Sequence, residues 1–299
     1  MFALIKLILL FLCVSTASLL AEAPLRVWVG IPPLEEIART VGGSHVQVEL
    51  LAGSGQNHET FAPSARQMRA LAHADVYFSS ALPFETALLQ RIRNSMPQLR
   101  VVDTTAAIPF LTIAKAHDCS NCGSQDHSHG QHPHHDPLLD VHRWLSPPIL
   151  MAQTKVIADT LAQLRPDAAD SIFSRANAIT AELEALDQSL QTLLEPFRND
   201  AFMINHPALG YFADHFGLRQ IAIESEGLQP SPARIRQLSS QAREASVRWI
   251  IVQAGQPRTA AAVIAQSLGL PVVEVDPLNP DALGEMRSLA KALAEPPAP

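Results

Sequence analysis

Cysteine, charged residues and aromatic residues are all scarce in this chain of 299 residues. It contains 3 cysteines, 17% charged residues and 5% aromatic residues. Cys13 lies near the N-terminus, and Cys119 and Cys122 lie together in one polar segment, so the sequence excludes any disulfide in the mature chain other than one between Cys119 and Cys122. The formal net charge of −7 lacks the basic excess of nucleic-acid-binding proteins, and we expect no nucleic-acid partner.

Long hydrophobic runs are absent after the N-terminus. The run at 7–14 (LILLFLCV) follows Lys6 and precedes small residues at 15–18. It is shorter than the roughly 20 residues that span a bilayer, and the pattern is typical of a secretory signal peptide. We expect residues 1–23 to be a cleaved signal and the protein to be periplasmic. Bulky residues at 11 and 12 argue against lipoprotein anchoring at Cys13.

Hydrophobic residues make up 47% of the sequence, and short apolar runs alternate with helical patterns. Apolar strands separated by helices are typical of parallel sheets that are covered on both faces. The expected strands are 25–31, 46–52, 74–80, 100–104, 201–205, 219–224, 248–253 and 271–275, and the expected helices include 64–73, 84–95, 231–245 and 259–268. Because four strands occur twice, the sequence predicts an α/β fold of two lobes, each with a four-stranded parallel sheet flanked by helices.

A long helical region is expected between the N-terminal lobe (24–165) and the C-terminal lobe (197–299). Ser146 and the two prolines after it begin a helical pattern that continues to 165. Pro166 and Pro196 then bracket a second run without glycine. A helix of roughly 28 residues would be about 42 Å long. We therefore predict that 166–196 is a rigid linking helix, with a helical hairpin inside one domain as the alternative.

Histidine is abundant, with 12 residues in the chain. Six of them lie in the polar segment 117–136, namely His117, His127, His129, His132, His134 and His135. Short His-rich tracts are typical of metal binding, so we expect this loop to capture metal ions. The alternative is a polar insertion whose histidines are incidental. Cys119 and Cys122 in the same segment either form a small disulfide or join the metal ligands, and the sequence leaves both open.

Four further candidate ligands lie beside predicted strands and helices. His58 follows the second strand, and His206 and Asp276 come at the ends of the fifth and eighth. His142 lies just before the helix that begins after Ser146. Ligands of open parallel sheets bind at the carboxyl ends of the strands, so side chains from two facing lobes would meet in a cleft. The sequence has no His-Glu-x-x-His motif and no paired Cys-x-x-Cys knuckle.

Several stretches of the chain, in order, carry a resemblance to a known family. They are 53–64 (GSGQNHETFAPS) with 74–76, 140–147 (DVHRWLSP), 205–214 (NHPALGYFAD) with 217–218, and 227–278, which ends in VDPL. In these stretches the chain resembles the metal-specific solute-binding proteins of ABC transporters, of the zinc/manganese ZnuA/TroA type. The resemblance extends from about residue 25 to the end. It implies two lobes with the metal between them and a long helix behind.

The resemblance also implies the metal ligands and the metal. Matched by position, the ligands are His58, His142, His206 and Asp276. A histidine at the third position is similar to zinc members, whereas manganese and iron members have glutamate there. Three neutral imidazoles and one carboxylate favour tetrahedral Zn²⁺ over Mn²⁺ or Fe²⁺. The implied protein is a monomer that delivers Zn²⁺ to the membrane permease of an ABC importer.

Three other functions remain open from the sequence. The first is a manganese or iron member of the same family, and the second is a periplasmic zinc buffer or chaperone with 117–136 as its main site. The third is a secreted zinc hydrolase, which needs an open metal position and a general base such as Glu59 or Glu224. A closed four-ligand site leaves no position for activated water, so we expect no enzymatic activity.

Overall fold

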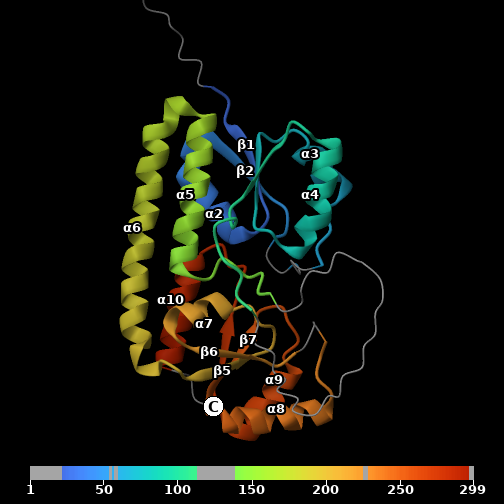
Figure 1. Ribbon diagram of the computed structural model, residues 1–299, viewed down its shortest axis with the longest axis vertical. Helices are drawn as coiled ribbons and strands as arrows, with labels where there is room; N and C mark the ends of the chain where they lie inside the picture. Colours follow the sequence, from blue (N-terminus) through green and yellow to red (C-terminus); the bar gives the residue numbers. More distant parts are fainter. Residues whose placement is uncertain (1–21, 54–55, 57–59, 113–138, 225–227, 296–299) are drawn as a thin grey trace, which may run out of the picture.

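Two parallel sheets with the same strand order form the framework of the protein. The computed structural model describes residues 22–53, 56, 60–112, 139–224 and 228–295, and within them eight strands form the two sheets (Figure 1). The N-terminal sheet has the order β2-β1-β3-β4, with β1 Leu25–Val29, β2 Val46–Leu50, β3 Val76–Ser79 and β4 Arg100–Asp103. The C-terminal sheet has the order β6-β5-β7-β8, with β5 Ala201–Ile204, β6 Arg219–Ala222, β7 Val247–Gln253 and β8 Val272–Val275. The predicted fold class is confirmed.

Helices cover both sheets, and three of them are not among those expected from the sequence. The N-terminal lobe has α2 Pro32–Gly42, α3 Ala65–Leu71 and α4 Pro83–Ser95, and the C-terminal lobe has α7 Gly210–Phe216, α8 Pro232–Glu244, α9 Thr259–Leu268 and α10 Ala282–Ala294. The additional helices are α2, α7 and α10. In α2, prolines occupy the first turn, and Leu34, Ile37 and Val41 form one buried face.

The longest helix of the described chain runs beside both lobes. It is α6 (Ala169–Leu194), which packs antiparallel to α5 (Pro147–Leu164) and contacts α2 in one lobe and α10 in the other (Figure 1). Its 26 residues correspond to about 39 Å of helix. The helix therefore spans the two lobes as predicted and also forms a hairpin with α5. The predicted lobe boundaries at 165 and 196 stay predictions.

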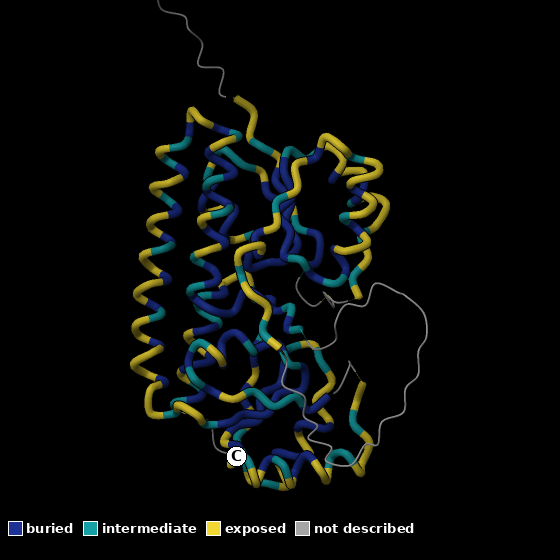
Figure 2. The backbone as a smooth tube through the Cα atoms, viewed as in Figure 1, coloured by how far each residue is buried: buried dark blue, intermediate teal, exposed yellow. Residues whose placement is uncertain are grey.

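Apolar packing is continuous from one lobe to the other. A single cluster of buried side chains includes Val29 and Phe78 of the N-terminal sheet, Leu183 of α6, and Phe202 and Trp249 of the C-terminal sheet. Figure 2 shows buried stretches of backbone in both lobes. A smaller cluster lies between the C-terminal sheet and the helices α8 and α9. Because close-packed side chains resist relative movement, the shared cluster makes the connection between lobes stiff. None of the described helices combines the length and apolarity that crossing a membrane requires.

A buried carboxyl group stabilises the turn between β3 and α4. Tyr77 donates a hydrogen bond to Oε1 of Glu85, and the backbone N–H groups of Leu82 and Ser80 donate to Oε2 at 2.7 and 3.0 Å. Ala81, inside this turn, has a φ of 54°, a conformation that non-glycine residues adopt at some cost. Burial raises the pKa of Glu85 to about 7, although these hydrogen bonds oppose the shift.

We predict that Glu85 makes the stability of the wild-type protein fall as the pH rises from about 5 to about 7.5. In this range the unfolded chain has lost the proton of this carboxyl, whereas the folded protein retains it up to about pH 7. The raised pKa therefore lowers the free energy of unfolding by up to about 3 kcal/mol by pH 7.5. Urea denaturation of the wild type and of Glu85→Gln across this range measures the effect. A stability difference between the two that does not change with pH would contradict the prediction.

Candidate metal centre

Two of the predicted ligands, His142 and His206, meet between the lobes. His142 lies on the segment that leads into α5, and His206 comes two residues after β5. Their Nε2 atoms are 3.1 Å apart, their ring planes are inclined at 77°, and their exposed fractions are 2% and 7%. Two imidazole nitrogens bound to one tetrahedral zinc ion at about 2.0–2.1 Å lie roughly 3.3 Å apart. The pair is therefore spaced to bind one metal ion.

Each imidazole is held by a carboxylate on its other nitrogen. Oδ1 of Asp140 accepts hydrogen bonds from Nδ1 and from the backbone N–H of His142, both at 2.8 Å. Oε1 of Glu224 lies 2.5 Å from Nδ1 of His206. A carboxylate at Nδ1 favours the proton on that nitrogen and orients the ring, which is the arrangement of histidines that bind a metal through Nε2.

Asp140 is fixed in turn by contact with the C-terminal lobe. Its carboxylate lies against Gly210, the first residue of α7, and a Cβ atom at that position would be only 2.1 Å from Oδ2. A residue with a side chain therefore cannot replace Gly210 unless Asp140 moves. The carboxylate that orients His142 thus depends on a close approach between the two lobes.

Of the other two predicted ligands, only Asp276 lies within the described residues, and it does not form a metal-binding group with this pair there. Asp276 follows β8, and its Oδ1 accepts a hydrogen bond from the backbone N–H of Leu278 at 3.0 Å. Within the part of the chain that the structure describes, no three His, Cys, Asp or Glu side chains are placed to hold one ion. His58 lies outside the described residues. The assignments of His58 and Asp276 as ligands stay predictions.

The predicted His-rich loop also lies outside the described residues, together with Cys119 and Cys122. The chain on either side of it is described. Thr112 and Leu139 form an antiparallel bridge, and the backbone N–H of Asp140 donates to the carbonyl oxygen of Leu111 at 2.8 Å. The described residues on both sides of 113–138 therefore lie immediately beside the carboxylate that holds His142.

Sequence reasoning missed the roles of Asp140 and Glu224. The Asp-x-His spacing of Asp140 and His142 is a local signal that was available. The sequence offers Glu224 only as the general base of a hydrolase. It is instead 8% exposed and bonded to His206, because the end of β6 lies beside the end of β5. Glu59, the other proposed base, lies outside the described residues.

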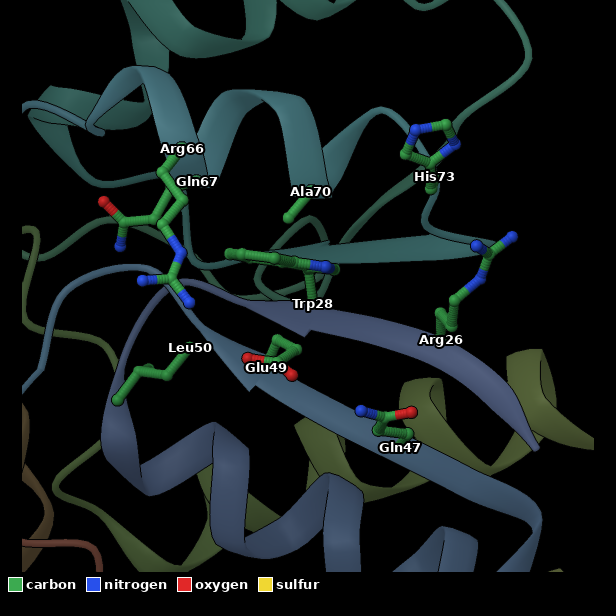
Figure 3. A pocket seen from close by; sticks show the side chains of 9 residues that line it. All are labelled: Arg26, Trp28, Gln47, Glu49, Leu50, Arg66, Gln67, Ala70 and His73. Carbon is green, nitrogen blue, oxygen red and sulfur yellow. The ribbon is translucent and has the colours of Figure 1, made fainter.

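A cavity of about 620 Å³ lies in the N-terminal lobe, but none of the proposed ligands lines it. Figure 3 shows it between α3 and the strands β1 and β2, with Trp28 at its centre and Arg66 and Arg26 on either side. Glu49 and His73 also line it, so that cationic and anionic groups are mixed. This lining does not form a set of metal ligands, and the histidine pair between the lobes is the better candidate.

Comparison with known protein sequences agrees with the family resemblance of the sequence. The family model described as "Zinc-uptake complex component A periplasmic" (ZnuA) matches residues 27–295. The chain is 27% identical over 273 residues to the zinc-binding lipoprotein AdcA of Streptococcus pneumoniae serotype 4, which covers 91% of this chain and 53% of that protein. It is 24% identical over 241 residues to the high-affinity zinc uptake system protein ZnuA of Yersinia pestis, with 76% of each chain covered. The chain thus spans about half the length of the AdcA relatives.

Solved structures share the fold. A crystal structure of ZnuA superimposes with a TM-score of 0.79 at 29% identity and covers 91% of this chain and 98% of its own. The Zn(II)-bound ZnuA-like domain of Streptococcus pneumoniae AdcA has a TM-score of 0.72 at 22% identity, with 91% and 98% covered, and shows likeness of fold. Because the family match extends over nearly the whole described chain and the two-lobed fold agrees with it, this protein belongs to the ZnuA family of periplasmic zinc-uptake components.

Proposed function

We propose that this protein binds one Zn²⁺ ion between its lobes in the periplasm and delivers it to the membrane permease of an ABC importer. The observation that carries the proposal is the buried pair His142 and His206, whose Nε2 atoms are 3.1 Å apart and whose Nδ1 atoms are each held by a carboxylate. His58 and Asp276 complete the proposed set of four ligands. The description of the family and the names of the relatives, which refer to zinc, support the same metal.

The nature of the ligands favours zinc over manganese or iron. Imidazole nitrogen suits Zn²⁺, whereas Mn²⁺ prefers carboxylate, carbonyl and water oxygen. The carboxylates of Asp140 and Glu224 each engage an Nδ1 atom and so act on the metal through the imidazoles. The described part of the site therefore offers nitrogen to the ion.

Binding without turnover is the activity that this arrangement supports. A zinc hydrolase needs an open coordination position and a general base near the metal-bound water. Glu224, the base proposed for such an enzyme, is occupied by its hydrogen bond to His206. We infer that the protein holds zinc as cargo and is not an enzyme.

The proposed site predicts a specific pattern of zinc binding. Titration of the mature protein should show one tight Zn²⁺ equivalent, and His206→Ala should abolish it because the ion loses one of two buried imidazoles. Deletion of 117–136 should remove several weak equivalents and retain the tight one. Competition with a chromophoric chelator measures both classes. His73→Ala, in the cavity of the N-terminal lobe, is the control and should retain the tight equivalent.

Two outcomes of this titration would contradict the proposal. If the tight equivalent is lost with 117–136 and is retained in His206→Ala, the protein is a buffer or chaperone whose main site is the loop. If the purified protein hydrolyses ester or peptide substrates with steady turnover that depends on zinc, the hydrolase alternative is correct.

We predict that Glu224→Gln weakens zinc binding roughly tenfold or more without abolishing it, as is typical when a carboxylate behind a metal-bound histidine is removed. The neutral amide makes a weaker partner for Nδ1 of His206 and lowers the basicity of the ring. Glu274→Gln is a matched control, since Glu274 forms an exposed ion pair with Arg258. Equal affinities of the wild type and Glu224→Gln in chelator competition would show that this carboxylate does not support the metal.

Gly210→Ala tests the contact between Asp140 and the C-terminal lobe. The new Cβ would lie 2.1 Å from Oδ2 of Asp140, so the carboxylate must move away and His142 must lose its alignment. We expect both a lower melting temperature and weaker zinc binding. Gly284→Ala is a matched control, because its Cβ would also lie 2.1 Å from a carboxylate oxygen, that of Asp281, which caps the start of α10. If both variants bind zinc equally well, the proposed link from Gly210 to the metal is wrong.

A further inference from the structure

The segment that contains His142 is bonded at both ends to the opposite lobe. It follows the N-terminal sheet in the chain and leads into α5, and it is buried from Asp140 to Trp144 except at Val141. At one end it contacts Tyr211 of α7, and at the other it contacts the loop after β8. Neither contact involves a metal ligand directly, so the proposed zinc site does not by itself explain them.

Tyr211 makes the first contact through its hydroxyl group. The hydroxyl oxygen accepts a hydrogen bond from the backbone N–H of Leu111 at 3.0 Å. Its single hydrogen points to two carbonyl oxygens, that of Pro109 at 3.0 Å and that of Asp140 at 3.3 Å. Burial raises the pKa of Tyr211, so the hydroxyl keeps this hydrogen at neutral pH. The Tyr211 side chain of the C-terminal lobe thus binds two separate segments of the chain beside His142, namely 109–111 and Asp140.

Trp144 makes the second contact. Its indole Nε1–H donates to the carbonyl oxygen of Pro277 at 2.6 Å, and its ring lies 5.4 Å from that of His142, measured between centroids. The loop that receives this bond is itself held by α10, because Glu285 accepts hydrogen bonds from the backbone N–H of Asp276 and from the side chain of Asn279, both at 2.8 Å. The second anchor is therefore a well-braced part of the C-terminal lobe.

We propose that Tyr211 and Trp144 are positioning residues of the metal centre, which hold the segment 140–144 against the C-terminal lobe so that His142 and His206 form a two-imidazole half-site before the metal arrives. This inference rests on the proposed zinc function. The N-terminal half of the chain supplies His142, but the hydrogen bonds attach it to the lobe that carries His206. Any movement of the N-terminal sheet relative to the C-terminal lobe then leaves the two imidazoles together.

Such a half-site strengthens binding by preorganisation. When the two imidazoles are already aligned, metal binding does not have to order the segment 140–144. The entropic cost of that ordering is avoided, and the affinity is higher by that amount. Hydrogen bonds that align a ligand contribute in the same way as those that orient a catalytic group: their loss weakens binding while the ligands themselves remain. The effect differs from that of removing a ligand, which abolishes the tight site.

The test uses Tyr211→Phe, Trp144→Phe and the double variant in the mature full-length protein. Each single variant should raise the dissociation constant for Zn²⁺ roughly 3- to 10-fold, which corresponds to the loss of one or two hydrogen bonds, and the double variant should raise it further. The visible absorption of the Co²⁺-loaded protein should also change in position or intensity, because the geometry of the nitrogen ligands is altered. A purely structural role would lower the melting temperature and leave this spectrum unchanged.

The chain offers matched controls for both substitutions. Tyr77→Phe removes the hydroxyl of the other tyrosine of the chain, which is buried and hydrogen-bonded within one lobe. Trp249→Phe reduces a buried tryptophan on β7 that packs against Phe197. Both should lower stability and leave the zinc affinity and the cobalt spectrum as in the wild type. If they weaken zinc binding as much as the test variants, general loss of packing is the cause and the proposal is overturned.

The outcomes separate this proposal from the proposed function. If the wild type has no tight zinc site, or if His206→Ala retains it, the zinc function itself fails. If the tight site exists and needs His206, but Tyr211→Phe and Trp144→Phe match the wild type in affinity and in the cobalt spectrum, only the positioning role is overturned. If one of the two variants does not fold, the other decides by the same two measurements.

Discussion

The requirement that two imidazoles from opposite lobes face each other in a buried space governs the rest of this structure. The two Nε2 atoms lie 3.1 Å apart in a buried space. Because a buried polar N–H group needs a partner, and because each ring must keep its orientation, each Nδ1 needs a hydrogen-bond acceptor. Those acceptors are carboxylates, and buried carboxylates themselves need fixed surroundings. Asp140 is packed against the start of α7, and Glu224 lies just after the end of β6. The orientation of the two imidazoles thus depends on residues where the two lobes meet.

The framework meets this requirement through its symmetry and its shared core. Both sheets have the same strand order and are parallel throughout, so each has one edge at which the chain emerges from the strands. The helix α6 is packed against both lobes, and one apolar cluster passes through it. A flexible linker would let the lobes sample many relative positions, whereas a packed helix restricts them. The precise spacing of His142 and His206 is consistent with such a restriction.

The sequence predicted the regular parts of this fold because their signals are local. All eight strands lie where apolar runs predicted them, Pro147 begins α5, and Pro166 and Pro196 follow the ends of α5 and α6. The helix α2 was harder to predict, because only Gly30 and Ile31 separate it from β1 and the apolar run of the expected strand includes both. Within the site, the pairing of His142 with His206 followed from their positions beside strands and from the family resemblance. The contact of Asp140 with Gly210 and the bond from Trp144 to Pro277 join residues 70 and 133 positions apart, and no local pattern encodes such pairs.

The bridge between Thr112 and Leu139 also has a consequence for the segment that carries His142. It brings residues 112 and 139 together just before residue 140. The path of the segment that carries His142 is therefore set by the bridge and by the hydrogen bonds of Tyr211. When the two ends of a connecting segment are held together, the entropic cost of closing it grows only slowly with its length. The bridge and Tyr211 therefore make the geometry of the centre between the lobes largely independent of the length of the chain between residues 112 and 139.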